Sequence, residues 1–359
     1  MGNNNLKILA FIGSYADAKD SGLYVCNFDE TSGSLELIEQ ASGLQNPTFL
    51  DVNANTSKLY AITEGVDADN QRCGAAAAYT INPSTGGLSL LNKENTVSAP
   101  TCHITLDHSG KVAIVSSYHG GMVGLSPLLE DGQIGTTADI QWHKSSSVPP
   151  VQARAHSVFI DRMNRFAVAC DLGLDRLFIY KLDLELSRLV PHREIQTAAG
   201  SGPRHFAFHP ALGFGYVIHE LNATVTAFAY DGEQGELAEI QVISTLPDSY
   251  NGENGCADIH ISPDGKFLYG SNRGHDSIVV YAIDQQTGKL RVVEHVSTLG
   301  GHPRNFGISP DGRFLLVANR DGNNIVTFRR DERTGKLQPT GSELHVSKPV
   351  CIKFARFEG

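Results

Sequence analysis

The stretch Cys256-Ala-Asp-Ile-His-Ile-Ser-Pro-Asp-Gly-Lys-Phe-Leu-Tyr-Gly-Ser-Asn272 recurs 47 residues later as Pro303-Arg-Asn-Phe-Gly-Ile-Ser-Pro-Asp-Gly-Arg-Phe-Leu-Leu-Val-Ala-Asn319, and the two align without a gap. Other segments fall into the same frame and begin further repeats near residues 47, 100, 155, 203 and 349. A repeat of about 40 to 50 residues with strand-like content is typical of a β-propeller blade.

Each repeat carries two turns between short runs of β-branched and aromatic residues. The first turn is Ser262-Pro-Asp-Gly265 in one repeat and Ser309-Pro-Asp-Gly312 in the next, and proline and glycine in these places suit a type I turn. The second turn, such as Thr287-Gly-Lys289, needs glycine because hairpin turns require positive φ. The runs between turns are too short for helices, so we expect an all-β chain.

The two ends of the chain complete one blade. Residues 348–355 supply one strand-like run, whereas residues 7–43 supply three runs without a first strand. Pairing them would remove an exposed sheet edge. We therefore predict a seven-bladed β-propeller over residues 1–359 as a single domain, with its ring closed by the C-terminal inner strand. The one candidate linker, residues 144–150, is expected to be a long loop between blades because the repeat frame continues across it.

Composition narrows the function classes. The formal net charge of -10 disfavours nucleic acid as a partner, since such binding needs a basic face. The six cysteines are far apart and never form C-x-x-C, which indicates neither a zinc site nor a redox dithiol. No transmembrane run or cationic leader is present. We expect a cytoplasmic monomer or weak homo-oligomer that binds no membrane, metal or cofactor.

Two positions of the repeat frame should meet at one mouth of the central channel. In an antiparallel four-stranded blade, the start of the innermost strand and the end of the second strand lie at the same end of the sheet. The first position holds Cys102, His156, Arg204, Ala257 and Arg304, and the second holds Tyr118, Leu172, Glu220, Arg273 and Arg320. A single arginine at a strand end is more often solvated than bound to a ligand, but the whole set predicts a ring of charges around one opening.

These residue types suit acid-base chemistry on an organic anion. The guanidinium groups of Arg204, Arg273 and Arg304 match a phosphate or carboxylate. His156 can exchange a proton near neutral pH, and we expect burial at the channel mouth to raise the pKa of Glu220 so that it can do likewise. A basic ring on an acidic protein also attracts an anion to the channel.

Other constellations are weaker. His205, His209 and His219 are close in sequence, but His209 falls at the opposite rim of the frame, and no carboxylate or cysteine completes a metal-ligand pattern. No G-x-S-x-G elbow, Walker loop or dinucleotide fingerprint occurs in a strand-to-helix context. Nucleophilic serine and cofactor chemistry are therefore unsupported.

Four motifs carry a family resemblance: Gly202-Pro-Arg-His-Phe-Ala-Phe-His-Pro210, His219-Glu-Leu-Asn222, Ala257-Asp-Ile-His-Ile-Ser-Pro-Asp-Gly265 and His302-Pro-Arg-Asn-Phe-Gly307. The chain resembles the propeller-type bacterial 6-phosphogluconolactonases and the related fungal carboxy-cis,cis-muconate cyclases over nearly its whole length. The resemblance implies a lactone that is opened by water, or formed from a muconate, by a set of His, Arg, Glu and Arg. The matching residues are His156, Arg204, Glu220 and Arg273, which the repeat frame also selects.

The favoured hypothesis is a lactonase of carbohydrate metabolism that hydrolyses 6-phosphogluconolactone to 6-phosphogluconate in the pentose phosphate pathway. The four matching residues would be catalytic, and Arg304, Arg320 and His205 would bind the small anionic substrate. The two catalytic arginines would hold the acid end and polarise the carbonyl. Either the glutamate or the histidine would activate water, and the other would protonate the leaving alkoxide.

Two alternatives stay open. A muconate cyclase would present the same four groups to a different anion. A non-catalytic propeller scaffold would bind partners instead, but the single tryptophan, Trp142, is not followed by aspartate, so the WD repeat signature is missing. The fold by itself does not choose among these functions.

Overall fold

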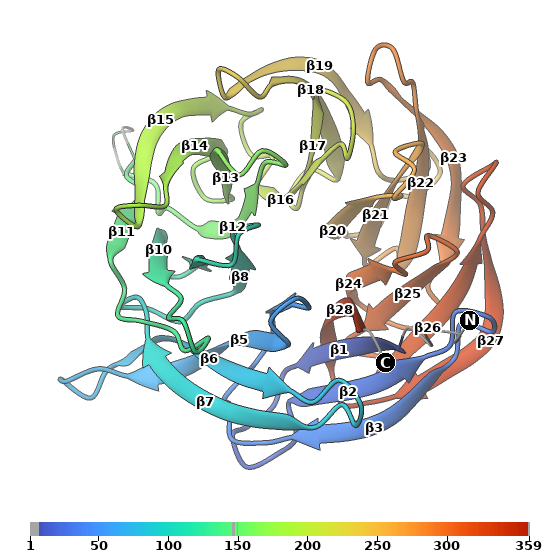
Figure 1. Ribbon diagram of the computed structural model, residues 1–359. Helices are drawn as coiled ribbons and strands as arrows, with labels where there is room; N and C mark the ends of the chain where they lie inside the picture. Colours follow the sequence, from blue (N-terminus) through green and yellow to red (C-terminus); the bar gives the residue numbers. More distant parts are fainter. Residues whose placement is uncertain (1–6, 146–147, 149, 358–359) are drawn as a thin grey trace, which may run out of the picture.

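The computed structural model describes residues 7–145, 148 and 150–357. These residues form seven four-stranded antiparallel sheets that stand as blades around a central channel (Figure 1). Neighbouring innermost strands contact each other all the way around the ring. No helix occurs in the described part of the chain. The predicted all-β, seven-bladed propeller is confirmed.

Six blades consist of four strands that follow one another in the sequence, and each is numbered outward from the channel. They are β4 (Leu50–Asn53), β5 (Lys58–Val66), β6 (Arg72–Ile81) and β7 (Leu88–Asn95); β8 (His103–Leu106), β9 (Val112–Ser117), β10 (Met122–Pro127) and β11 (Asp139–Trp142); β12 (Ala155–Ile160), β13 (Phe166–Asp171), β14 (Arg176–Asp183) and β15 (Arg188–Gln196); β16 (Pro203–Phe208), β17 (Phe214–His219), β18 (Thr224–Asp231) and β19 (Glu236–Ser244); β20 (Gly255–Ile261), β21 (Phe267–Arg273), β22 (Ser277–Ile283) and β23 (Leu290–Ser297); and β24 (Pro303–Ile308), β25 (Phe314–Asn319), β26 (Asn324–Arg330) and β27 (Leu337–His345).

The seventh blade joins the two ends of the chain, as predicted. Its strand order is β28 (Pro349–Phe357), β1 (Lys7–Ser14), β2 (Leu23–Phe28) and β3 (Leu35–Ala41). The red C-terminal strand therefore lies beside the dark blue N-terminal one in Figure 1. Backbone hydrogen bonds between β28 and β1 close the ring, so β1 does not end the sheet as a free edge.

The core lies between the blades, because both faces of each sheet are covered. Along β21, Leu268 packs toward the blade that begins with β16, whereas Phe267 and Tyr269 pack toward Phe328 of the following blade. This is the two-residue alternation of a strand that is buried on both sides. It accounts for the apolar residues at successive positions of the middle strands.

The glycine turns are where the sequence places them. In both Ser-Pro-Asp-Gly turns the glycine amide donates to the serine carbonyl at 2.8 Å, and Gly265 and Gly312 have φ of 72° and 74°. The segment 144–150 connects the outer strand β11 to the inner strand β12 of the next blade, which confirms a loop between blades. Residues 146, 147 and 149 of that segment lie outside the described residues.

Candidate active site

Three of the predicted site residues line one cavity at the mouth of the channel. This cavity has a volume of about 540 Å³, and its walls include His156, Glu220 and Arg304 together with Cys102 and Tyr118 from the same two frame positions. His156 and Arg304 occupy the first frame position, in β12 and β24. Glu220 occupies the second frame position and directly follows β17. The antiparallel arrangement thus brings the two frame positions to one rim, as expected from the repeat register.

A bulge in the inner strand aims these side chains. Pairing with the second strand shifts by one residue at His156 in β12, at Arg204 in β16 and at Arg304 in β24. A bulged residue is left out of the ladder, and its side chain is redirected relative to the regular alternation. The same bulge occurs in three blades, so it orients one site residue in each of them.

Glu220 is the centre of a charged cluster. Its Oε2 accepts from Arg204 Nε at 2.8 Å and pairs with Arg273 Nη2 at 2.9 Å. The Arg204 side chain is only 2% exposed, against 23% for the carboxylate. Arg273 is also bound to backbone, since its Nε donates to the Gly255 carbonyl at 2.9 Å and its Nη2 to the Cys256 carbonyl at 2.8 Å. The two arginines therefore support the glutamate rather than project into the cavity.

The expected rise in the pKa of Glu220 is wrong. Burial on its own would raise this pKa, but Arg204, Arg273 and Arg304 together lower it below the ordinary value of 4.5. The repeat register predicted that Glu220 is buried at the channel mouth. It could not predict that the guanidinium groups of Arg204 and Arg273 both bind the same carboxylate oxygen. Glu220 is consequently a carboxylate at neutral pH. Burial and the neighbouring Arg273 and Arg304 lower the pKa of Arg204 to about 9, so it stays charged at neutral pH.

His156 is a neutral imidazole at the inner end of the cavity. It is 4% exposed, and its Nδ1 is buried without a hydrogen-bond partner among the described residues. Burial lowers its pKa well below 6.5, and the charge of Arg204 lowers it further. The Cys102 thiol donates to the His156 carbonyl at 3.1 Å, and the Tyr118 ring lies edge-on to the imidazole with 6.0 Å between ring centroids.

Arg304 differs from the other two arginines. It lines the cavity, yet within the described residues its guanidinium forms no ion pair and contacts only the ring of Tyr15, with 5.7 Å between Cζ and the ring centroid. A charged guanidinium without an internal carboxylate is available to an anion.

The last two predicted substrate-binding residues do not line this cavity. Arg320 lines a neighbouring cavity of about 680 Å³, where Asp321, the next residue, binds its Nε at 2.6 Å. His205 is 2% exposed and lies beneath the site, where its Nδ1 bonds Asp258 at 2.7 Å. The frame assigned Arg320 to this rim but did not index His205, and it does not show which neighbour binds a side chain.

Most of the remaining cavity wall was not predicted. The residues concerned are Tyr15, Asn46, Thr48, Glu64, Arg72, Pro100, Thr101 and His119. Glu64 joins two of them, because it accepts from Asn46 at 2.9 Å and from Arg72 Nε at 2.9 Å. Two signals were available: Thr48 and Thr101 lie at the repeat starts near residues 47 and 100, and His119 directly follows the frame position of Tyr118.

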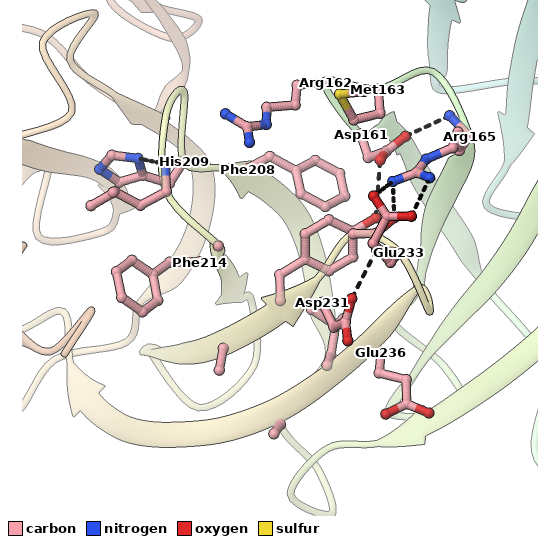
Figure 2. A pocket seen from close by; sticks show the side chains of 17 residues that line it. Asp161, Arg162, Met163, Arg165, Phe208, His209, Phe214, Asp231, Glu233 and Glu236 are labelled. Carbon is pink, nitrogen blue, oxygen red and sulfur yellow. Dashed lines mark hydrogen bonds and ion pairs between the residues drawn. The ribbon is translucent and has the colours of Figure 1, made fainter. Parts of the chain in front are cut away.

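A larger cavity of about 740 Å³ lies on the opposite rim, between the turns that follow β12 and β16 (Figure 2). Several of its polar groups bind each other: Arg165 forms an ion pair with Glu233 at 2.9 Å, and Asp161 accepts a hydrogen bond from the Tyr230 hydroxyl at 3.2 Å. Both ring nitrogens of His209 are occupied by backbone groups. Arg162 forms no ion pair among the described residues and donates to the Ala211 carbonyl at 2.9 Å. None of the predicted site residues lines this cavity, so it is the weaker candidate.

No cluster of three or more His, Cys, Asp or Glu side chains suited to a metal ion occurs in the described residues. Within the same residues, no helix is long and apolar enough to cross a membrane.

Comparison with known proteins agrees with this geometry. The family model of the seven-bladed β-propeller lactonases matches residues 9–354. The chain is 36% identical over 303 residues to a 6-phosphogluconolactonase of Bacillus subtilis, covering 84% of each chain. It is 38% identical over 308 residues to a 6-phosphogluconolactonase of Formosa agariphila, covering 83% of this chain and 85% of that one.

A solved structure of a gluconolactonase has the same fold. The periplasmic gluconolactonase PpgL of Pseudomonas aeruginosa superposes with a TM-score of 0.89 at 30% identity, over 98% of this chain and 99% of that one. The match to the family model spans the blades that build the cavity as well as the blade that closes the ring. The chain belongs to the family of seven-bladed β-propeller lactonases.

Proposed function

We propose that this protein hydrolyses a sugar-acid lactone, 6-phosphogluconolactone, to 6-phosphogluconate in the cavity lined by His156, Glu220 and Arg304. The observation that carries the proposal is a carboxylate kept ionised by two arginines, next to a neutral imidazole and an unpaired guanidinium, in a cavity of about 540 Å³. The relatives named 6-phosphogluconolactonase support a phosphorylated substrate and a place in the pentose phosphate pathway.

Arg304 binds the anionic end of the substrate. It is the cavity arginine without an ion pair in the described part of the chain. Arg204 and Arg273 are already engaged by Glu220 and by backbone carbonyls. This assignment moves the anion-binding role of the sequence hypothesis from the two buried arginines to Arg304. Arg204 and Arg273 then stabilise the negative charge of Glu220.

Glu220 acts as the general base. Both arginines form their ion pairs with Oε2, so Oε1 is the oxygen that accepts a proton from water. The water oxygen forms a bond to the carbonyl carbon, and its proton passes to Glu220. The ring C–O bond then breaks, and the ring oxygen takes that proton to become a hydroxyl group. The product acid ionises and releases one proton to solvent.

His156 orients the attacking water. Its imidazole is neutral, so one ring nitrogen can accept a hydrogen bond from the water. Because Glu220 and His156 are both in their proton-accepting forms, neither carries a spare proton at the start of the reaction. A single proton shuttled by Glu220 replaces the two separate acid and base roles of the sequence hypothesis.

We place the reaction in the cytoplasm, with the small anion as the partner. All six cysteines are free thiols, which suits a reducing compartment. The pairing of β28 with β1 covers the edge of β1 that another copy could otherwise extend, which supports a monomer or a weak homo-oligomer.

The test is initial-rate hydrolysis of freshly prepared 6-phosphogluconolactone, with the uncatalysed rate subtracted. Glu220→Gln should lower kcat by about 100-fold or more, the usual contribution of a general base. The matched control is Glu233→Gln, which breaks an Arg–Glu pair on the opposite rim and should leave kcat unchanged. Equal rates for both variants would remove Glu220 from the mechanism. A wild-type protein that leaves the lactone untouched but changes the ultraviolet absorbance of carboxymuconate would replace the lactonase with the cyclase.

A further inference from the structure

Aromatic and histidine rings from four neighbouring blades pack against each other. The Phe49 and His103 rings are tilted by 35° with 4.2 Å between centroids, and Phe159 lies 5.0 Å from His103 and 5.6 Å from His205. All four side chains come from the inner strands or the residue just before one. His103 and His205 are each 2% exposed, and the His205 ring lies 5.2 Å from that of the cavity residue His156, so these rings form a buried floor beside the cavity.

Asp258 is a buried carboxylate directly behind this floor. It is 2% exposed and lies in the irregular part of β20, next to Ala257. Its Oδ1 accepts from His205 Nδ1 at 2.7 Å, and its Oδ2 accepts from His260 Nε2 at 2.9 Å and from the Asn305 amide. A buried charge with this many donors is held in one position.

The neighbours of His205 allow only one tautomer. A carboxylate without a proton accepts only, so the Nδ1 that faces Asp258 must carry hydrogen. A guanidinium donates only, so the Nε2 that lies 3.3 Å from Arg204 Nη1 must present its lone pair. Burial lowers the pKa of His205 to about 4, and Arg204 adds to the effect, so the ring is neutral at neutral pH.

We propose that Asp258 is a positioning residue for hydrolysis: by holding His205 in the Nδ1–H tautomer, it makes His205 an acceptor that fixes the Arg204 guanidinium against Glu220. This inference rests on the proposed function. Arg204 is anchored on three sides, by Glu220 at Nε and by His205 and the Ala257 carbonyl at Nη1. If the His205 proton moved to Nε2, a donor would face a donor, and Arg204 would have to leave its place beside Glu220.

The chain of contacts also crosses blades. His205 belongs to β16, Asp258 to β20 and Asn305 to β24, and the Asn305 side-chain oxygen accepts from the Ile352 amide of β28 at 2.7 Å. Each contact joins neighbouring blades at the channel. The orientation of Arg204 is thereby tied to the relative placement of several blades and not to its own strand alone.

The test is the tautomer of His205, read from the ¹⁵N chemical shifts of its ring in protein with ¹⁵N-labelled histidine and assigned with a His205→Gln variant. In the wild type, Nε2 should be of the hydrogen-free type at neutral pH. In Asp258→Asn the amide can donate to Nδ1, so the proton should move to Nε2. Lactone hydrolysis should then fall about 10- to 100-fold in kcat/KM, as expected for disturbing one charge-assisted hydrogen bond.

The control is His260→Asn, which removes a different donor from the same carboxylate. His260 has a side chain that is 36% exposed and contacts Oδ2, so its loss should leave the His205 tautomer and the rate unchanged. A wild-type His205 with hydrogen on Nε2 would overturn the proposal even if Asp258→Asn failed to fold. So would a folded Asp258→Asn protein that hydrolyses the lactone at the wild-type rate. A wild-type protein without lactonase activity would instead refute the proposed function, with the tautomer still deciding whether Asp258 orients His205.

Discussion

The charge state of Glu220 determines how activity should depend on pH. Its pKa is lowered, so the carboxylate is present above the ordinary value of 4.5 and is lost only as the pH falls below it. His156 also stays neutral across this range because burial lowers its pKa well below 6.5. We therefore expect kcat/KM to be flat between pH 6 and pH 8 and to fall only in more acidic solution. The pH profile of initial rates, corrected for spontaneous hydrolysis, measures this.

The same profile of Arg273→Gln serves as the comparison. Removing one of the cations that lower the pKa of Glu220 should move the acid limb to higher pH. An inflection near 6.5 in the wild type would contradict the assignment, because it would mean that an ordinary histidine of the free enzyme must be in one protonation state for hydrolysis.

Arg304 should control substrate affinity rather than the chemical step. Arg304→Gln removes the unpaired cation of the cavity, and we expect KM to rise about 10- to 100-fold with a small change in kcat, since a charged hydrogen bond to the substrate is lost in ground and transition states alike. Arg329→Gln is the control, because Arg329 stacks on Phe314 away from the cavity. A fall in kcat without a rise in KM would place Arg304 in the chemistry instead.

The residues that the sequence could place are those whose role depends on register alone. His156, Glu220 and Arg304 line the cavity because a repeat position fixes the rim. Arg320 could not be excluded in advance, because its capture by the adjacent Asp321 depends on side-chain direction. Asp258 and its link to His205 could not be foreseen, because that contact joins two blades through a bulged strand.

At the scale of elements, the loop between β11 and β12 is fastened at both ends by one carboxylate. Asp171 Oδ2 bonds His143 Nδ1 at 2.7 Å, and its Oδ1 accepts from the Arg154 amide at 2.8 Å and from the Gly173 amide at 3.0 Å. Asp171 is fully buried. Asp171→Ala should leave these buried donors unsatisfied and lower the free energy of unfolding by about 3 kcal/mol.

Urea unfolding of Asp171→Ala measures this loss, and limited proteolysis reports whether cleavage concentrates between residues 143 and 154. The exposed Glu185→Ala, in the neighbouring hairpin, should unfold like the wild type. An unchanged urea midpoint for Asp171→Ala would show that the loop ends are held by other contacts. The sequence predicted this loop because the repeat frame continues across it, but the contact that holds its ends joins residues 28 positions apart.

At the scale of the whole molecule, strand periodicity made the ring predictable. The repeat spacing determines the number of blades, and the missing first strand of the N-terminal segment requires that β28 supply it. The ring contacts at the floor of the cavity were not predictable, because they depend on which of two alternating faces each inner strand turns toward the axis.

Closure by β28 makes a final prediction about assembly. Deleting residues from Pro349 onward exposes the hydrogen-bonding edge of β1 and removes the buried side chains of Cys351 and Ile352 from the ring. We expect the shortened chain to associate through that edge and to lose lactone hydrolysis, because an open, flat edge pairs with other chains. Adding a synthetic peptide of residues 349–357 should restore monomer size and part of the activity, whereas a scrambled peptide should not. Size-exclusion chromatography and rate assays would contradict this view if the shortened chain alone stayed monomeric and active, since the six remaining blades and three strands would then hold the ring without their closing strand.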